Sequence, residues 1–180
     1  MKKAIVTGGA GFIGSHIVDF LVQQETEVLV VDDLSSGSEQ NLSNAKSVNA
    51  NLLELEVADI CSEKARKAVE AFKPEVIFHQ AAQMNVRRSV DEPMFDAEKN
   101  ILGTINLLES GKNIGLKKFV FASTGGAIYG EQMQFPATEQ HSIAPECPYG
   151  VSKRSAELYI QYFSRIHSIP SICLRYGNVY

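Results

Sequence analysis

The chain has 180 residues, which is enough for one α/β domain with a core of its own. With 44% hydrophobic and 21% charged residues its composition is ordinary for a globular protein, and a net charge of −4 provides no basic face for a nucleic acid. The three cysteines have no C-x-x-C spacing, so neither a disulfide framework nor a metal site is expected. Without a signal peptide or an apolar run long enough for a membrane span, the sequence predicts a cytoplasmic protein and no membrane partner.

The chain opens with a predicted strand, glycine turn and helix start, from Lys3 to Gly14. Residues 4–6 form a short apolar run, which is typical of a strand buried on both faces. Gly8, Gly11 and Gly14 follow at intervals of three. This spacing allows a tight turn, a close approach of backbone amides to a pyrophosphate, and close packing of the helix on the strand. The N–H groups at the helix start would attract the phosphates.

The second predicted strand favours a dinucleotide site over an ordinary glycine-rich turn. This strand is expected over Glu27–Val31 and ends at Asp32, about 20 residues beyond the glycines. At that distance a carboxylate meets the adenosine ribose of a bound dinucleotide. Asp33 follows directly, and two carboxylates would repel the 2′-phosphate of NADP. The sequence therefore predicts NAD as the cofactor.

The rest of the chain alternates helices and strands. Helices are expected over residues 12–24, 62–72, 94–110 and 149–166, with one helical turn at 39–42 inside a polar loop over 33–51. Further strands are expected over residues 52–57, 76–79, 118–123 and 171–175. This alternation predicts an α/β fold, a Rossmann-type doubly wound parallel sheet flanked by helices. We expect residues 1–180 to form one domain that binds its ligands beyond the carboxyl ends of the strands.

Residues suited to ligand binding follow several strands at that edge. Asp59 comes after the third strand, Ala81 after the fourth and Thr124 after the fifth. The small residues within 79–83 would leave room for a nicotinamide ribose; the alternative is that they pack closely against a neighbouring strand.

A second motif, Tyr149-Gly150-Val151-Ser152-Lys153, indicates catalysis. Its tyrosine and lysine are four residues apart and therefore share one face of a helix. A phenol normally loses its proton near pH 10, and a nearby ammonium lowers that pKa. Tyr149 could then act as a general base towards a sugar hydroxyl. Such a pair also occurs by chance on helix surfaces, but Ser123 and Thr124 favour catalysis, because a hydroxyl there could bridge the substrate and the tyrosine.

Together these motifs resemble those of a known family. In chain order they are TGGAGFIG (7–14), VVDDLSSG (30–37), Asp59-Ile60, HQAAQ (79–83), Asn100 within NILGTINLLE, FASTGGAIYG (121–130), PYGVSK (148–153) and LRYGNVY (174–180). The chain is identified as a member of the extended short-chain dehydrogenases/reductases, in the NAD-dependent nucleotide-sugar epimerase/dehydratase family. Within that family it is most similar to the UDP-glucose 4-epimerases.

The resemblance implies a role for each matching residue. Those that would bind the pyrophosphate are Gly8, Gly11, Phe12, Ile13 and Gly14. Those at the adenosine end are Asp32, Asp33, Ser36, Gly37, Asp59 and Ile60. Those around the ribose of the nicotinamide and the pyrophosphate are Ala81, Ala82, Gln83, Asn100, Tyr149 and Lys153. Thr124, or Ser123 in its place, would orient the sugar, and Asn178 would contact the phosphates of the substrate.

The implied reaction is epimerisation of a UDP-sugar at C4 through a transient 4-keto intermediate, in a homodimer. The family's dehydratases carry an acid/base pair directly after the active-site threonine, where this chain has Gly125 and Gly126. The alternatives are a UDP-sugar decarboxylase, a reductase, a uronate epimerase, or a non-catalytic NAD-binding module. The smaller carboxyl-terminal substrate domain of the family is absent from these 180 residues, so we expect the cofactor-binding and catalytic part.

Overall fold

The protein is built around a six-stranded parallel sheet, and the computed structural model describes all 180 residues. The strands lie in the order β3-β2-β1-β4-β5-β6, and every neighbouring pair is parallel. Their bounds are β1 (Lys3–Thr7), β2 (Glu27–Asp32), β3 (Leu53–Val57), β4 (Val76–His79), β5 (Lys118–Thr124) and β6 (Ser171–Tyr176). The predicted Rossmann-type sheet is confirmed, and the strand order reverses between β1 and β4, where such sheets bind ligands.

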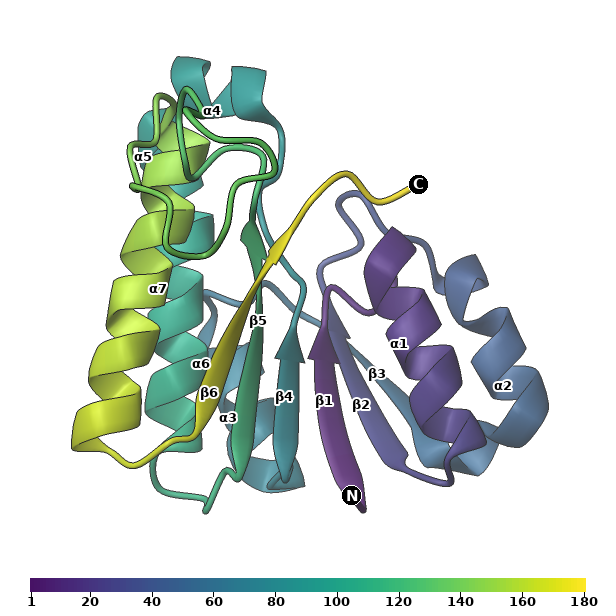
Figure 1. Cartoon of the computed structure of the whole chain (residues 1–180). Coiled ribbons are helices and arrows are strands. Elements are labelled where there is room, and N and C mark those ends of the chain that lie inside the picture. Colours follow the sequence, from purple (N-terminus) through teal and green to yellow (C-terminus); the bar gives the residue numbers. More distant parts are fainter.

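Helices cover both faces of this sheet (Figure 1). Their bounds are α1 (Phe12–Gln23), α2 (Ser43–Asn49), α3 (Glu63–Phe72), α4 (Val86–Asp91), α5 (Pro93–Ala97), α6 (Gly103–Gly111) and α7 (Pro148–Ile166), with the short turns η1 (Glu39–Leu42), η2 (Ala50–Leu52) and η3 (Glu98–Leu102). Helices α1 and α2 lie on one face, and α3, α6 and α7 lie on the other. No helix in the structure combines the length and the apolar character that a membrane crossing requires.

Strand β1 separates two hydrophobic cores. Ile5 belongs to a core of 17 buried residues on the side of α3, α6 and α7. Ala4 and Val6 belong to a core of 11 buried residues on the side of α1 and α2. Successive residues of a strand point to opposite faces, so a strand covered on both faces is apolar throughout. This confirms the prediction of a fully buried first strand.

The segment between β2 and β3 contains more helix than the sequence predicts. A polar loop with one helical turn is expected over 33–51, but α2 follows η1 there. Only Ala45 of α2 is buried, and it packs in the core beside α1. A helix with a single buried residue shows no apolar periodicity, and for this reason the pattern failed to indicate it.

The helix predicted over 94–110 forms in that region, but it contains an irregular turn that the sequence pattern does not predict. The chain forms α5 from Pro93, widens into the π-helical turn η3, and continues as α6. Asn100 within η3 points into a buried polar network, and Gly103 approaches Ile60 so closely that a Cβ would lie 2.6 Å from its Cδ1. Both constraints are tertiary contacts, which a local helical pattern does not contain.

His79 at the end of β4 ties three elements together inside the protein. The ring is 1% exposed. Thr104 of α6 donates its hydroxyl to the carbonyl of Asn100, so it accepts from Nε2–H of His79 at 3.0 Å. Nδ1 then accepts from the hydroxyl of Thr7 in β1 at 2.6 Å. Burial, helped by the charge of Lys153, lowers the pKa of His79 to about 3, so the ring is neutral.

This buried histidine makes stability dependent on pH. The unfolded chain binds a proton near the ordinary pKa of 6.5, whereas the folded ring resists it down to about 3. The stabilisation is therefore complete above pH 6.5 and is lost as the pH falls towards 3, at about 1.4 kcal/mol per pH unit. The free energy of unfolding can be measured by urea unfolding at several pH values between 3 and 6.5, for the protein and for His79→Gln. Its dependence on pH should be steeper in the unmodified protein. His16→Gln, at an exposed position, is the control, and equal slopes for the protein and His79→Gln would contradict the prediction.

Candidate active site

The glycine turn between β1 and α1 leaves backbone N–H groups free for a ligand. Gly8 has φ +66°, and a Cβ there would lie 2.6 Å from the backbone nitrogen of Ala81. A Cβ at Gly14 would lie 2.1 Å from the carbonyl oxygen of Gly8. No group of the chain accepts from the N–H groups of Phe12, Ile13 or Gly14 at the start of α1. This turn fits the pyrophosphate of a dinucleotide, because anions bind at such unpartnered helix starts.

Asp32 at the end of β2 is held beside this turn. Its carboxylate accepts from the N–H groups of Ala10 and Leu34, each at 2.9 Å. Gly37 packs against the same Ala10, so that a Cβ would lie 2.9 Å from the carbonyl oxygen. The predicted residues of the adenosine end therefore gather around the glycine turn. The side chains of Asp33 and Ser36 are exposed there.

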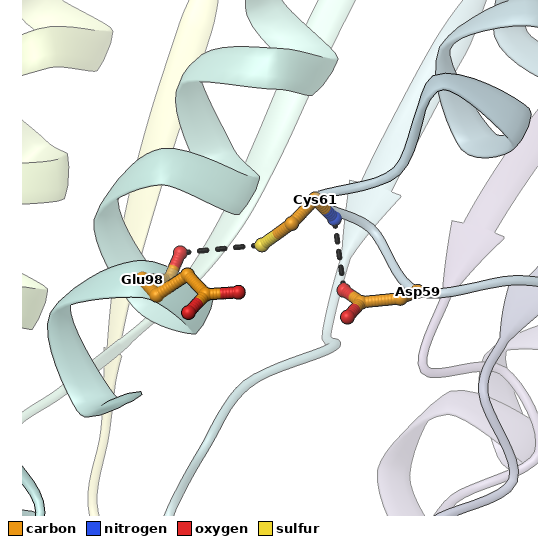
Figure 2. Close-up of side chains that lie close together, drawn as sticks. All are labelled: Asp59, Cys61 and Glu98. Atoms are coloured by element: carbon orange, nitrogen blue, oxygen red, sulfur yellow. Dashed lines mark hydrogen bonds between the residues drawn. The ribbon is translucent and has the colours of Figure 1, made fainter. Parts of the chain in front are cut away.

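Asp59 after β3 is paired with a cation of the chain. Burial raises its pKa, but hydrogen bonds from Lys99 and from the N–H of Cys61 lower it below its ordinary value. Figure 2 shows Asp59 beside Cys61 and Glu98, three residues of types that can bind metals. Burial raises the pKa of the Cys61 thiol to about 12, and the thiol donates to the carbonyl of Glu98. A paired carboxylate and a protonated thiol are poor metal ligands, so we interpret this cluster as structural.

Ile60, which is expected to contact adenine, has its side chain in the core. Its side chain is 6% exposed and belongs to the core. It packs against Gly103 of α6, and its carbonyl accepts from Asn106 at 2.7 Å. A contact with adenine would therefore have to come from the backbone of Ile60 instead of the side chain.

The loop after β4 is held by Asn100. The Asn100 side chain accepts from the N–H of Gln83 at 2.9 Å and donates to its carbonyl at 2.9 Å. Asn100 is 2% exposed and bonded to the chain through both ends of its amide, so it holds the loop in place. Ala81 and Ala82 are half-buried, and the backbone of Ala81 packs against Gly8. This contact favours the alternative that the small residues of this loop serve close packing.

Tyr149 and Lys153 lie on one face of α7, as their spacing predicts. The Nζ of Lys153 is 5.9 Å from the centre of the Tyr149 ring and 4.7 Å from that of Phe121. Lys153 is 2% exposed and donates to the carbonyl of Ala122 in β5 at 2.9 Å. The dyad is thereby anchored to the strand that ends at Thr124.

The charges of the dyad differ from the expectation. Burial lowers the pKa of Lys153 to about 8, and Asp96 opposes this fall. Burial also raises the pKa of Tyr149, Thr124 opposes the rise, and Asp96 and Cys147 add to it. In this structure the Tyr149 hydroxyl is therefore a neutral phenol at neutral pH. The sequence leads us to expect that the Lys153 ammonium lowers the pKa of Tyr149; in this structure burial is the largest influence on that pKa and raises it.

The two adjacent hydroxyls after β5 face different neighbours. Ser123 is buried and donates to the carboxylate of Glu157 at 2.7 Å. Arg154 and Arg175 hold the same carboxylate, at 2.9 Å and 2.8 Å. Thr124 instead acts on the hydroxyl of Tyr149. Ser123 is thus occupied by Glu157, whereas Thr124 is the hydroxyl that lowers the pKa of Tyr149.

Asn178 and a further acidic residue complete the comparison with the sequence. Asn178 is exposed in the segment after β6 and has no hydrogen bond to the dyad. The sequence argument missed Asp96, which is buried beside Asn100 and acts on both members of the dyad. Its four-residue spacing from Asn100 was the only signal, and such spacings are common on helices.

Comparison with known proteins agrees with this arrangement. Residues 4–180 match the model of the NAD dependent epimerase/dehydratase family, and the chain belongs to that family. A putative UDP-glucose 4-epimerase of Methanocaldococcus jannaschii is 46% identical over 176 residues, which are 98% of this chain and 55% of that protein.

Two solved structures are similar at the level of the fold. The UDP-glucose 4-epimerase of Thermotoga maritima with UDP-glucose has a TM-score of 0.92 and 45% identity, over 99% of this chain and 56% of the other. The UDP-glucose 4-epimerase of Thermus thermophilus with NAD has a TM-score of 0.91 and 41% identity, with the same coverage. The chain thus spans about half the length of these relatives.

Proposed function

We propose that the chain is the cofactor-binding and catalytic part of a nucleotide-sugar epimerase that uses NAD and inverts C4 of a UDP-sugar, interconverting UDP-glucose and UDP-galactose. In this proposal residues 1–180 form one NAD-binding domain. The observation that carries it is the position of Thr124, Tyr149 and Lys153 at the same sheet edge as the glycine turn. The UDP-glucose 4-epimerases that the chain resembles support it.

Each residue of the dyad has a task that follows from its surroundings. Bound NAD would supply a hydride acceptor for C4 and give the hydride back to the other face of the sugar. Thr124 would orient the C4 hydroxyl towards Tyr149, which in its deprotonated, phenolate form would take up the proton of that hydroxyl and later return it. The buried ammonium of Lys153 would bind the ribose of the nicotinamide and favour the phenolate as it forms. Asn178 would contact the phosphates of the substrate.

The cofactor preference can be tested by thermal melting. Asp32 is fixed beside the glycine turn by two N–H groups and Asp33 is exposed next to it, so a 2′-phosphate would meet negative charge. NAD at about 100 times its Kd should add about 2.7 kcal/mol of stability and raise Tm by roughly 5–10 °C. NADP at the same concentration should raise it far less. ADP-ribose, which retains the pyrophosphate and both riboses, is the control ligand and should also stabilise. Equal shifts with NAD and NADP would contradict the preference, and no shift with either would contradict the cofactor site.

The role of Tyr149 can be tested by removing its hydroxyl. Tyr149→Phe should lower the rate at which a UDP-sugar reduces bound NAD by about 10²-fold or more, because the general base is lost. The shift of Tm with NAD should remain. The matched control is Tyr159→Phe, an exposed tyrosine of the same helix, which should keep the rate. If Tyr149→Phe kept the rate, the proposed mechanism would be wrong. If neither the protein nor the control reduced NAD, these residues would be a binding module only.

We also propose that the chain forms a homodimer through α7 and the adjacent η3 segment. These two segments pack against each other, and α7 lies at one edge of the molecule (Figure 1). The exposed apolar residues are Leu102, Val151, Leu158, Tyr159, Tyr162 and Ile166. A surface of this kind indicates a contact with another protein, and a second copy carries the same apolar face.

Sedimentation of the protein and of one charged variant tests the dimer. The protein should sediment as a dimer, and Leu158→Lys should sediment as a monomer, because it places two like charges in an apolar contact. Leu158 is 50% exposed, so the substitution leaves the core intact. Val57→Lys, at an exposed position on β3, is the control and should remain dimeric. A monomeric protein at high concentration, or a dimeric Leu158→Lys, would disprove this interface.

A further inference from the structure

Asp96 of α5 is a buried carboxylate with one oxygen that the chain leaves without a partner. The residue is 1% exposed. Its Oδ1 accepts from Nε2 of Gln83 at 2.8 Å and from Nδ2 of Asn100 at 3.1 Å. Its Oδ2 is buried and accepts no hydrogen bond from any group of the chain. Burying a carboxylate is costly unless a charge or a full set of hydrogen bonds compensates it, so this oxygen requires an explanation.

The hydrogen bonds of Asp96 lead directly to the catalytic helix. Nδ2 of Asn100 also donates to the hydroxyl of Ser152 at 3.1 Å. That hydroxyl in turn donates to the carbonyl of Tyr149 at 3.0 Å. Ser152 precedes Lys153 in sequence, so the network ends on the backbone between the two members of the dyad. Both α5 and η3 pack against α7, which makes this a contact between whole elements.

Lys153 is a buried cation without an anionic partner in the chain. It is a buried ammonium whose hydrogen bond within the chain goes to the carbonyl of Ala122, and no carboxylate lies within salt-bridge distance of it. Of the other charged groups on the elements around Asp96, Arg87 and Asp91 of α4 are exposed to solvent and others are paired. On α4, Arg88 pairs with Glu92, and on η3, Lys99 pairs with Asp59 and with the exposed Glu98.

On α7 the remaining carboxylate is also paired, and Arg165 lies in the last turn of the helix, away from its start at Pro148. Glu157 pairs with Arg154 and Arg175. Cys147, at the start of that helix, is a thiol. Asp96 is thus left as the negative charge for the dyad.

We propose that Asp96 is a positioning residue of the dyad. One of its oxygens ties the loop at Gln83 and the turn at Asn100 to α7, and the other supplies a buried negative charge to the dyad. This inference rests on the proposed catalytic role of Tyr149 and Lys153. The direction of both pKa changes agrees, since Asp96 raises the pKa of Lys153 against burial and raises that of Tyr149 together with burial.

The test is the titration of Tyr149 in Asp96→Asn. The amide keeps an acceptor for Gln83 and Asn100 but removes the charge, so the pKa of Tyr149 should fall by about half a unit or more. Phenolate absorbance reports it, as the difference between each protein and the same protein carrying Tyr149→Phe. Asp91→Asn removes an exposed carboxylate on α4 and should leave the midpoint unchanged. A folded Asp96→Asn with an unchanged midpoint would overturn the proposal, even if its Tm fell, because a merely structural role changes stability alone.

A second measurement keeps the proposal testable if Asp96→Asn does not fold. In the unmodified protein, the carboxyl carbon resonance of Asp96 should shift near pH 8, where Lys153 loses its proton, and Lys153→Met should abolish that step. A resonance without this step would overturn the proposal. Both measurements use the protein without NAD or sugar. Their failure is therefore distinguishable from failure of the proposed epimerase activity, which the reduction of NAD reports.

Discussion

The close contact between the turn after β1 and the loop after β4 is the constraint on which the site depends. Gly8 takes φ +66° and lies so near Ala81 that no side chain fits between them. The contact sits where the strand order reverses, because β1 and β4 are neighbours in the sheet but not in the chain. The free N–H groups of α1 and the loop held by Asn100 are thereby brought to one edge. One steric condition on the backbone therefore positions both the phosphate-binding turn and the loop beside the dyad.

Burial, more than pairing, sets the charges at this edge. His79 is neutral because burial, helped by the charge of Lys153, lowers its pKa. Burial also lowers the pKa of Lys153, to about 8, which is close to neutral pH. A lysine so placed responds strongly to any charge brought near it. The same desolvation that raises the pKa of Tyr149 thus makes the dyad sensitive to Asp96 and to a bound ligand.

The fold and the centre of the site could be predicted because they depend on short-range patterns. The glycine spacing requires only backbone geometry, and the buried β1 requires only an apolar run between two covered faces. The π-helical turn η3 could not be predicted, because Asn100 in that turn donates hydrogen bonds to Gln83 and Ser152, which are distant in sequence. The neutral state of Tyr149 could not be predicted either, since burial is a property of the whole fold. The positions of the site residues at the sheet edge could be predicted from the sequence pattern. Their charges and the orientations of their side chains depend on tertiary contacts and could not.

The π-helical turn η3 and the buried carboxylate of Asp96 belong to the same hydrogen-bond network. A regular helix from Pro93 to Gly111 would keep every backbone hydrogen bond, so the wide turn must be offset by contacts elsewhere. Asn100 provides three of them, to Gln83, Asp96 and Ser152, and all are buried. Buried polar networks of this kind fix a unique arrangement when every member is satisfied. Here one carboxylate oxygen of Asp96 is left without a partner. The network itself continues from Asn100 through Ser152 to the helix that carries Tyr149 and Lys153. The irregular turn therefore connects the architecture of the sheet edge to the electrostatics of the dyad.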